Sequence, residues 1–287
     1  GETLDEALGV VDRLAAGGFL ASLNHLGERT ESVADAEAAT AGYVAIVDRL
    51  RARPPATDCY VSVKLTQLGL DLDPALTTAN LRRILEAARP ADLFVRIDME
   101  HSRYVDATLA LIEAMRAEGF ARLGAVIQAY LYRSEDDVRG LLAARCRLRL
   151  CKGAYKEPPE IAFPRKKDVD ANYDRLANLL IEGSKANGSP LLSPDGKTPP
   201  IPAIASHDPK RLVHAKAVAQ QIGLPRQALE FQMLYGIRRD LQEETVKEGY
   251  PVRVYVPYGT EWYPYFVRRL AERPANLWFF VSNFFRK

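Results

Sequence analysis

The feature of this sequence that most constrains its fold is a regular alternation of short β-type runs with amphipathic helical stretches. Within the stretch 32–53, Tyr43, Val47 and Leu50 recur near the 3.6-residue spacing of a helix. Strands that alternate with helices form a parallel sheet. The expected strands span 19–24, 60–64, 93–98, 124–128, 148–151, 201–205, 229–232 and 252–256. The expected helices span 4–16, 32–53, 74–88, 104–118, a segment from Ser134, 169–185, a segment from Pro209, 240–247 and 262–272.

About eight β/α pairs in 287 residues match the size of a (β/α)₈ barrel of the TIM type. The opening helix, over 4–16, precedes the first strand and has no strand before it. We therefore predict an α/β fold in which residues 1–287 form one barrel domain with an N-terminal helix. The alternative is an open, doubly wound sheet, although its usual GxGxxG turn follows none of the expected strands.

The composition excludes several classes of protein. A net charge of +2 gives no basic stripe for nucleic acid, so no nucleic-acid partner is expected. The three cysteines, Cys59, Cys146 and Cys151, have no metal-ligand spacing, and we expect reduced thiols and no bound metal. Because no apolar run approaches about 18 residues and no signal peptide is evident, a cytoplasmic protein is expected.

Polar or charged residues stand at or near the ends of nearly all the expected strands. The carboxyl ends of barrel strands form the rim at which catalytic side chains converge. A solvated strand end is a sufficient explanation for any single residue, but the recurrence favours a functional rim. The residues are Lys64, Asp98, Gln128, Arg149, Lys152, Ser206, His207, Gln232 and Tyr255.

Two long loops interrupt the alternation. The loop 153–168 follows a strand, which places it at the catalytic end of a barrel. The loop 187–200 precedes a strand, so we expect a surface insertion without chemistry at the opposite end.

The rim is cationic and neutral-polar, which suits anionic ligands such as a carboxylate, a phosphate or a reduced flavin. Paired carboxylates for glycoside hydrolysis and a GxSxG elbow are both absent from the sequence. One alternative is a barrel lyase or aldolase in which Lys64 or Lys152 forms a Schiff base. Another is a binding protein, without a cofactor, that captures carboxylates at this rim.

Six sequence blocks, in collinear order from about Leu23 to Phe280, resemble the proline dehydrogenase family. They are Arg96-Ile-Asp-Met-Glu100, Val126-Ile-Gln-Ala-Tyr130, Arg149-Leu-Cys-Lys-Gly-Ala-Tyr155, Ala205-Ser-His-Asp208, Glu230-Phe-Gln-Met-Leu-Tyr-Gly236, and Tyr255-Val-Pro-Tyr-Gly259 together with Tyr265-Phe-Val-Arg-Arg-Leu-Ala-Glu272. The chain looks like the stand-alone bacterial form, since no aldehyde dehydrogenase domain follows.

The resemblance implies a distorted (β/α)₈ barrel with FAD at its carboxyl rim. It also implies oxidation of L-proline to Δ1-pyrroline-5-carboxylate by hydride transfer to the flavin, the first step of proline catabolism. A quinone would accept the electrons, which implies a peripheral contact with the inner face of the cell membrane.

Carried over position by position, the resemblance also implies a set of site residues. Those around the substrate are Lys64, Asp98, Tyr255, Tyr265, Arg268 and Arg269, with Asp98 and Arg149 taken as catalytic. Those that hold FAD are Met99, Gln128, Arg149, Cys151, Lys152, Gly153, Tyr155, Ser206, His207 and Glu272. The chain departs from some family members at Lys156, where an aromatic residue follows this block.

The chemistry of proline suggests roles for these residues. Arg268, Arg269 and Lys64 would clamp the carboxylate, since guanidinium is a planar fork for that group. Asp98 is expected to be an electrostatic partner of the cations, with a general base for the amine as the alternative.

The remaining roles concern the proline ring and the cofactor. Tyr255 and Tyr265 would wall the ring. Arg149 or Lys152 would favour reduced, anionic flavin, and His207 would donate a hydrogen bond to the cofactor.

Overall fold

The computed structural model describes residues 1–27, 30–53 and 59–262. Four predicted site residues, Tyr265, Arg268, Arg269 and Glu272, lie outside them, as does nearly all of the helix expected over 262–272. The assignments made for these residues therefore stay predictions.

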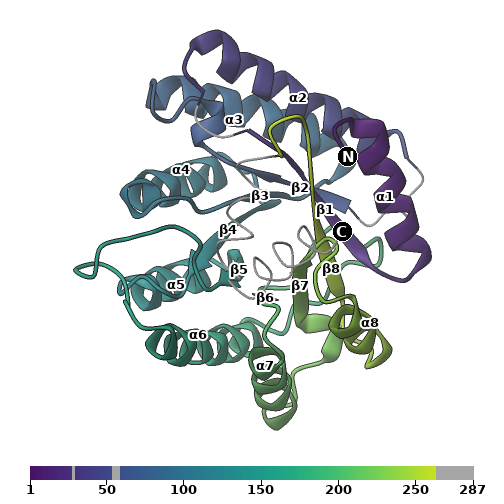
Figure 1. The fold of residues 1–287 in the computed structure, drawn as a ribbon, viewed down its shortest axis with the longest axis vertical. Coiled ribbons are helices and arrows are strands. Elements are labelled where there is room, and N and C mark those ends of the chain that lie inside the picture. The colour runs from purple at the N-terminus through teal and green to yellow at the C-terminus, as the bar shows by residue number, and fades with distance from the viewer. Residues whose placement is uncertain (28–29, 54–58, 263–287) are drawn as a thin grey trace, which may run out of the picture.

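Eight parallel strands close into a barrel in the order in which they follow one another along the chain (Figure 1). The ring closes because β1 pairs with both β2 and β8, with Ser22 opposite Tyr60 on one side and Tyr255 on the other. The predicted barrel is confirmed, and the alternative of an open sheet is wrong. The strands are β1 (Leu20–His25), β2 (Cys59–Val63), β3 (Val95–Ile97), β4 (Leu123–Gln128), β5 (Arg147–Cys151), β6 (Pro202–Ala205), β7 (Glu230–Leu234) and β8 (Val252–Tyr258).

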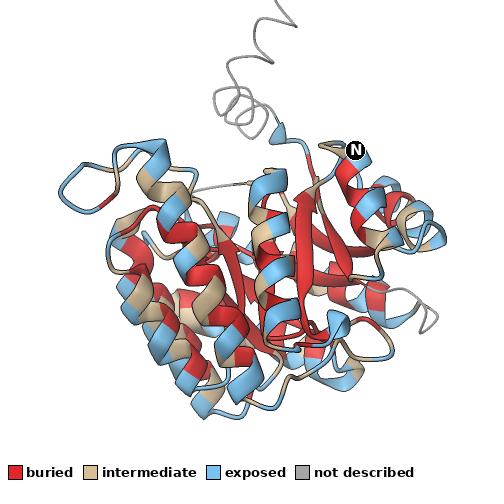
Figure 2. Ribbon diagram, turned by 90° about the horizontal axis from the view of Figure 1, so that it is seen from below, coloured by how far each residue is buried: buried red, intermediate tan, exposed pale blue. Residues whose placement is uncertain are grey.

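The helices surround the strands, and their apolar faces pack on the outside of the barrel (Figures 1 and 2). The predicted N-terminal helix is confirmed as α1, which packs against β1 and β8. The helices are α1 (Leu4–Ala16), α2 (Val33–Arg51), α3 (Pro74–Ala88), α4 (Val105–Ala117), α5 (Ser134–Ala143), α6 (Lys166–Ala186), α7 (Pro209–Gln221) and α8 (Arg239–Lys247). Short 3₁₀ turns, which were not predicted, are η1 (Thr66–Leu68), η2 (Arg89–Ala91), η3 (Ser102–Tyr104) and η4 (Arg226–Ala228).

Side-chain caps mark the starts of α1, α2, α3 and α7. Before α3, an Asp73 carboxylate oxygen accepts the Ala75 N–H at 2.8 Å, and Pro74 occupies the first helical position. Asp208 caps α7 in the same way, ahead of Pro209. At α5 the helix begins at Ser134 as predicted, but the Ser134 hydroxyl donates to the Gln128 carbonyl at 2.5 Å and so ties α5 to the end of β4.

The barrel interior is polar, whereas barrels of this type are usually filled by branched apolar side chains. Alternate strand residues point inward, because side chains along a strand alternate between its two faces. The inward set contains four arginines, Arg96, Arg147, Arg149 and Arg253, and Arg96 and Arg253 are fully buried. The buried polar side chains of this interior include Tyr60, Ser62, Arg96, Arg149, Glu230, Gln232 and Arg253.

The loop 187–200 lies at the amino-terminal end of the barrel, as predicted. Its second half is not a surface insertion, however, since Gly196 and residues 198–200 are buried. The Gly196 carbonyl accepts a hydrogen bond from Arg253 Nη2 at 2.7 Å, and the Pro199 carbonyl accepts one from Arg147 Nε at 2.5 Å. This half of the loop therefore closes the lower end of the barrel, where interior arginines need acceptors.

Candidate active site

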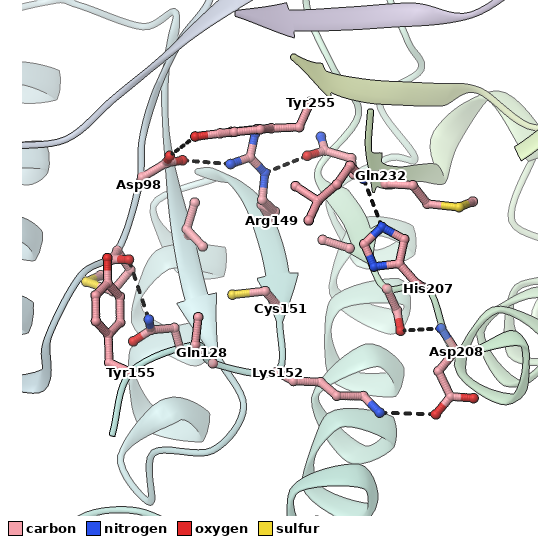
Figure 3. Close-up of a pocket in the computed structure, with 18 of the residues that line it drawn as sticks. Asp98, Gln128, Arg149, Cys151, Lys152, Tyr155, His207, Asp208, Gln232 and Tyr255 are labelled. Carbon is pink, nitrogen blue, oxygen red and sulfur yellow. Dashed lines mark hydrogen bonds and ion pairs between the residues drawn. The ribbon is translucent and has the colours of Figure 1, made fainter. Parts of the chain in front are cut away.

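A cavity of about 710 Å³ opens at the carboxyl ends of the strands (Figure 3). Every predicted site residue that falls within the described part of the chain lines this cavity. These residues are Lys64, Asp98, Met99, Gln128, Arg149, Cys151, Lys152, Gly153, Tyr155, Ser206, His207 and Tyr255. The strand-end pattern thus brings together residues that are up to 191 positions apart in sequence.

Asp98, directly after β3, is the anionic centre of the site. One carboxylate oxygen accepts from Arg149 Nη1 at 2.7 Å, and the other accepts from the Tyr255 hydroxyl at 2.7 Å and from Lys64 Nζ at 3.3 Å. Burial raises the pKa of Asp98, but the Lys64 and Arg149 charges and the hydrogen bonds outweigh burial and leave the pKa below its usual value. The geometry therefore favours the electrostatic role over that of a general base.

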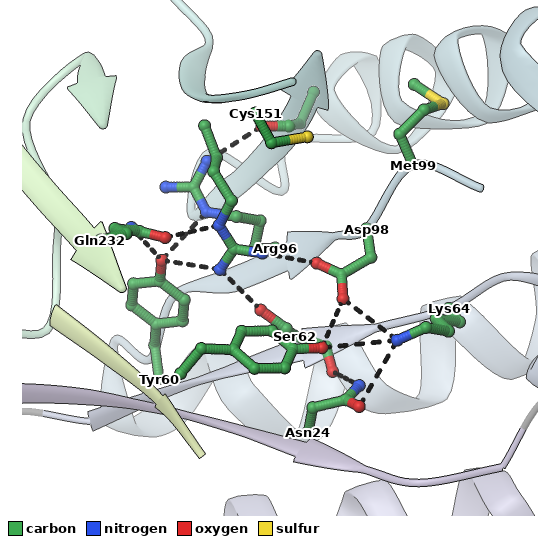
Figure 4. A network of polar contacts seen from close by, with 12 residues as sticks. Asn24, Tyr60, Ser62, Lys64, Arg96, Asp98, Met99, Cys151 and Gln232 are labelled. Atoms are coloured by element: carbon green, nitrogen blue, oxygen red, sulfur yellow. Dashed lines mark hydrogen bonds and ion pairs between the residues drawn. The ribbon is translucent and has the colours of Figure 1, made fainter. Parts of the chain in front are cut away.

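Lys64, directly after β2, completes this cluster (Figure 4). Its ammonium group lies within 3.4 Å of the Asn24 amide oxygen and of the Tyr255 hydroxyl, in addition to Asp98. Surroundings made of oxygen acceptors suit a charged ammonium rather than a nucleophilic amine. This observation does not favour the Schiff-base alternative.

Arg149 projects from the middle of β5 into the barrel and is held on every side of its guanidinium. Nε donates to Gln232 Oε1 at 2.5 Å, and Nη2 donates to Ser62 Oγ at 3.0 Å. The guanidinium carbon also lies 5.2 Å from the centroid of the Tyr255 ring. The cation is only 6% exposed, so the protein fixes both its orientation and its charge.

Gln128, at the end of β4, presents an acceptor without a partner among the described residues. Its Nε2 donates to the Met99 carbonyl at 3.4 Å, whereas its Oε1 is buried and has no hydrogen bond. A buried, unpaired amide oxygen is costly and indicates that a ligand N–H or O–H completes the site.

Gly153, in the loop after β5 and two residues after the end of that strand, has φ of +114°, a conformation that favours glycine. A Cβ at this position would lie 2.3 Å from the Tyr130 ring. Two residues on, the Tyr155 ring stacks against His101 with 4.3 Å between centroids. The Glu157 carboxylate then accepts from the Ser102 hydroxyl at 2.6 Å, which fastens this loop to the loop after β3.

Lys152 points away from the Asp98 cluster and toward the starts of α6 and α7 (Figure 3). Its ammonium group pairs with Asp170 of α6 and, at 3.1 Å, with Asp208 at the start of α7. Of the two cations considered for the isoalloxazine ring, Arg149 is therefore the one that lies beside Asp98 and Tyr255.

Ser206 and His207 follow β6. The Ser206 hydroxyl accepts from the Asp208 N–H at 3.1 Å. The backbone N–H of Leu234 donates to His207 Nε2 at 2.9 Å, which places the ring proton of the neutral imidazole on Nδ1. The hydrogen bond that we expect His207 to donate would thus come from Nδ1.

The polar residues beneath the rim, including Tyr60 and the Glu230–Arg253 ion pair, were not predicted from the sequence. The signal was present as polar residues at alternate strand positions: Tyr60, Ser62 and Lys64 in and after β2, Glu230 and Gln232 in β7. A spacing of two identifies one strand face, but it does not say whether that face is the barrel interior.

A closed (β/α)₈ barrel with charged side chains around a cavity at its carboxyl rim defines the class of the barrel enzymes. The particular family follows from comparison with known proteins. A family model described as proline dehydrogenase matches residues 7–281, and the chain belongs to that family.

Relatives and solved structures agree with this assignment. The chain is 38% identical to proline dehydrogenase 1 of Bacillus subtilis over 288 residues, which is 100% of this chain and 89% of that protein. It is also 38% identical to proline dehydrogenase of Deinococcus radiodurans, over 99% of this chain and 87% of that protein. The crystal structure of proline utilization A from Bdellovibrio bacteriovorus inactivated by N-propargylglycine superposes with a TM-score of 0.82 and 30% identity. That match covers 94% of this chain but only 31% of the other, so the chain spans about a third of that larger protein.

Proposed function

We propose that this protein is an FAD-dependent proline dehydrogenase that oxidises L-proline to Δ1-pyrroline-5-carboxylate by hydride transfer to the flavin. Membership of the family supports the activity. The observation that carries the site assignment is Asp98, an ionised carboxylate that holds Lys64, Arg149 and Tyr255 together at one cavity.

The residues present fit a flavin. The unpaired Gln128 Oε1 would accept an N–H of the isoalloxazine ring, and Arg149 would offer positive charge to its reduced form. Gly153 lines the cavity, and its lack of a Cβ makes room for the Tyr130 ring. When bound, the flavin supplies the acceptor for the hydride, whereas the protein supplies orientation and charge.

The substrate side of the cavity follows from the Asp98 cluster. Lys64 provides a fixed cation for the carboxylate of proline, and the Tyr255 ring provides an apolar wall for the pyrrolidine ring. Because its two cations keep Asp98 ionised, this carboxylate is a weak base for the amine proton of proline. The proton is then lost to solvent, either in the site or before proline binds. Arg268 and Arg269, the predicted carboxylate clamp, and Tyr265 and Glu272 lie outside the described residues.

We further propose that a quinone accepts the electrons and that the protein is cytoplasmic and contacts the inner face of the membrane peripherally. The family resemblance supports this proposal. In the described part of the chain, no helix combines the length and hydropathy that crossing a bilayer requires.

An absorption spectrum of the purified protein tests the proposal. We expect the bands of oxidised flavin, and bleaching when L-proline is added without air. NADH should not bleach the flavin, and a soluble quinone should restore the colour. A colourless protein that FAD cannot reconstitute would refute the assignment.

A further inference from the structure

The barrel interior contains a fully buried phenol that the proposed function does not use. Three N–H groups converge on the Tyr60 hydroxyl oxygen: Gln232 Nε2 at 2.9 Å, Arg96 Nε at 3.0 Å and Arg149 Nη2 at 3.4 Å (Figure 4). Among the residues that the structure describes, no acceptor receives a hydrogen from this oxygen. A neutral phenol oxygen has two lone pairs and one hydrogen to donate, whereas a phenolate accepts three hydrogen bonds.

The identity of these three donors is fixed by their other contacts. Gln232 Oε1 accepts a hydrogen bond from Arg149 Nε, so the amide nitrogen of Gln232 must face Tyr60 and Glu230. This nitrogen donates to Glu230 Oε1 at 2.5 Å. A flipped amide would place its NH₂ group against a guanidinium. Arg96 and Arg149 always carry their protons, so neither can act as an acceptor for the Tyr60 hydrogen.

Charge balance points the same way. The buried ionised groups of this network are three arginines and two carboxylates: Arg96, Arg149, Arg253, Asp98 and Glu230. With Tyr60 neutral, these five groups carry a net charge of +1, and Lys64, which pairs with Asp98, raises the net charge of the network to +2. An uncompensated buried charge is strongly unfavourable, and a phenolate at Tyr60 lowers this excess from +2 to +1.

The pKa directions agree with this geometry. Burial raises the pKa of Tyr60, yet the charges of Arg96 and Arg149 outweigh it and leave the pKa below that of a free phenol. Two other fully buried tyrosines, Tyr43 and Tyr173, have pKa values raised by burial well above the ordinary value. Each lacks a hydrogen bond from an arginine among the described residues, which makes them internal references.

We propose that Tyr60 is a phenolate in the folded protein and is a positioning residue for Arg149. Its proton passes to solvent as the chain folds. The Tyr60 oxygen and the Ser62 hydroxyl both accept hydrogen bonds from Arg149 Nη2. Gln232 accepts from Arg149 Nε, and Asp98 accepts from Arg149 Nη1. The guanidinium is thereby held in one orientation beneath the cavity by four acceptors from β2, β7 and the end of β3, of which Asp98 and the Tyr60 phenolate are negative.

Carbon NMR of protein labelled at the tyrosine Cζ tests the ionisation without reference to flavin. Thirteen tyrosines contribute signals. At neutral pH we expect one signal at the downfield position of a phenolate, lost in Tyr60→Phe and retained in Tyr173→Phe. If all signals lie at the phenol position, or if the phenolate signal survives in Tyr60→Phe, the proposal is wrong. Should Tyr60→Phe fail to fold, the double variant Y60F/R96M removes the Tyr60 hydroxyl together with the Arg96 guanidinium that donates to it. Loss of the phenolate signal in that variant would assign the signal to Tyr60.

The positioning role rests on the proposed function, and the midpoint potential of bound flavin tests it. Loss of the phenolate leaves more uncompensated positive charge at Arg149, which favours reduced, anionic flavin. Tyr60→Phe should therefore raise the midpoint potential, whereas Tyr173→Phe should leave it unchanged. An unchanged potential in Tyr60→Phe would overturn the positioning role. A protein that binds no flavin would refute the proposed function instead, and the NMR signal would still decide the ionisation.

Discussion

The most direct test of the site is the replacement Asp98→Asn, which keeps the shape of the side chain and removes its charge. Asp98, Arg149 and Lys64 have side chains that are 11%, 8% and 13% exposed, so their ion pairs are nearly buried. Removal of one partner from a buried pair costs about 3–5 kcal/mol. We expect a loss near the lower end of this range, about 3 kcal/mol, because the amide oxygen still accepts from Arg149.

The pH dependence of this loss follows from the lowered pKa of Asp98. A carboxylate whose pKa is lower in the folded state than in the unfolded state stabilises the protein at any pH above its unfolded-state pKa of about 3.9. This contribution is lost as the pH falls through the folded-state pKa. The difference between wild type and Asp98→Asn should thus be constant from pH 8 to about 5 and shrink only below about 4.

Urea unfolding at several pH values measures this difference. The matched control is Asp106→Asn, which removes a pair with Arg133 at 2.7 Å whose Asp106 side chain is 84% exposed. Such surface pairs contribute about 0–1 kcal/mol. A loss in Asp98→Asn as small as that of the control, or one that disappears already at pH 6, would refute the reasoning.

Three further predictions concern other parts of the chain. Gly153→Ala should lower the midpoint of thermal unfolding and weaken flavin binding, because the new Cβ would meet the Tyr130 ring. The control is Gly188→Ala, which is also at positive φ but has open space around it and should cost only about 1 kcal/mol of backbone strain. Equal losses of stability in the two variants would argue against the steric cause. Arg268→Met or Arg269→Met should lower kcat/KM for L-proline about 10- to 150-fold, since a charge-assisted hydrogen bond is worth about 1.5–3 kcal/mol, and unchanged steady-state kinetics in both would remove the clamp. Shortening within 188–192 should leave flavin occupancy and turnover unchanged, because this half of the loop lies at the end of the barrel away from the cavity; loss of flavin from the folded variant would contradict this.

Much of the candidate site could be predicted because the fold places strand ends together. Lys64 and Asp98 follow buried strands, and parallel strands of a barrel end at one rim. Partners could not be predicted in the same way. Lys152 was expected near the flavin ring but pairs with Asp170 and Asp208, because a long side chain reaches whichever carboxylates the neighbouring helix starts present.

The sequence by itself determined the strand and helix order, the closed barrel and the rim on which chemistry collects. Hydrophobic periodicity and capping residues act locally, so they can be recognised along the chain. Only the tertiary structure decided that Tyr60, Arg96, Glu230 and Arg253 meet inside the barrel, or that the loop 187–200 closes its lower end. Those contacts join residues from different strands, and their free energy depends on burial and on the sum of nearby charges, which no local pattern records.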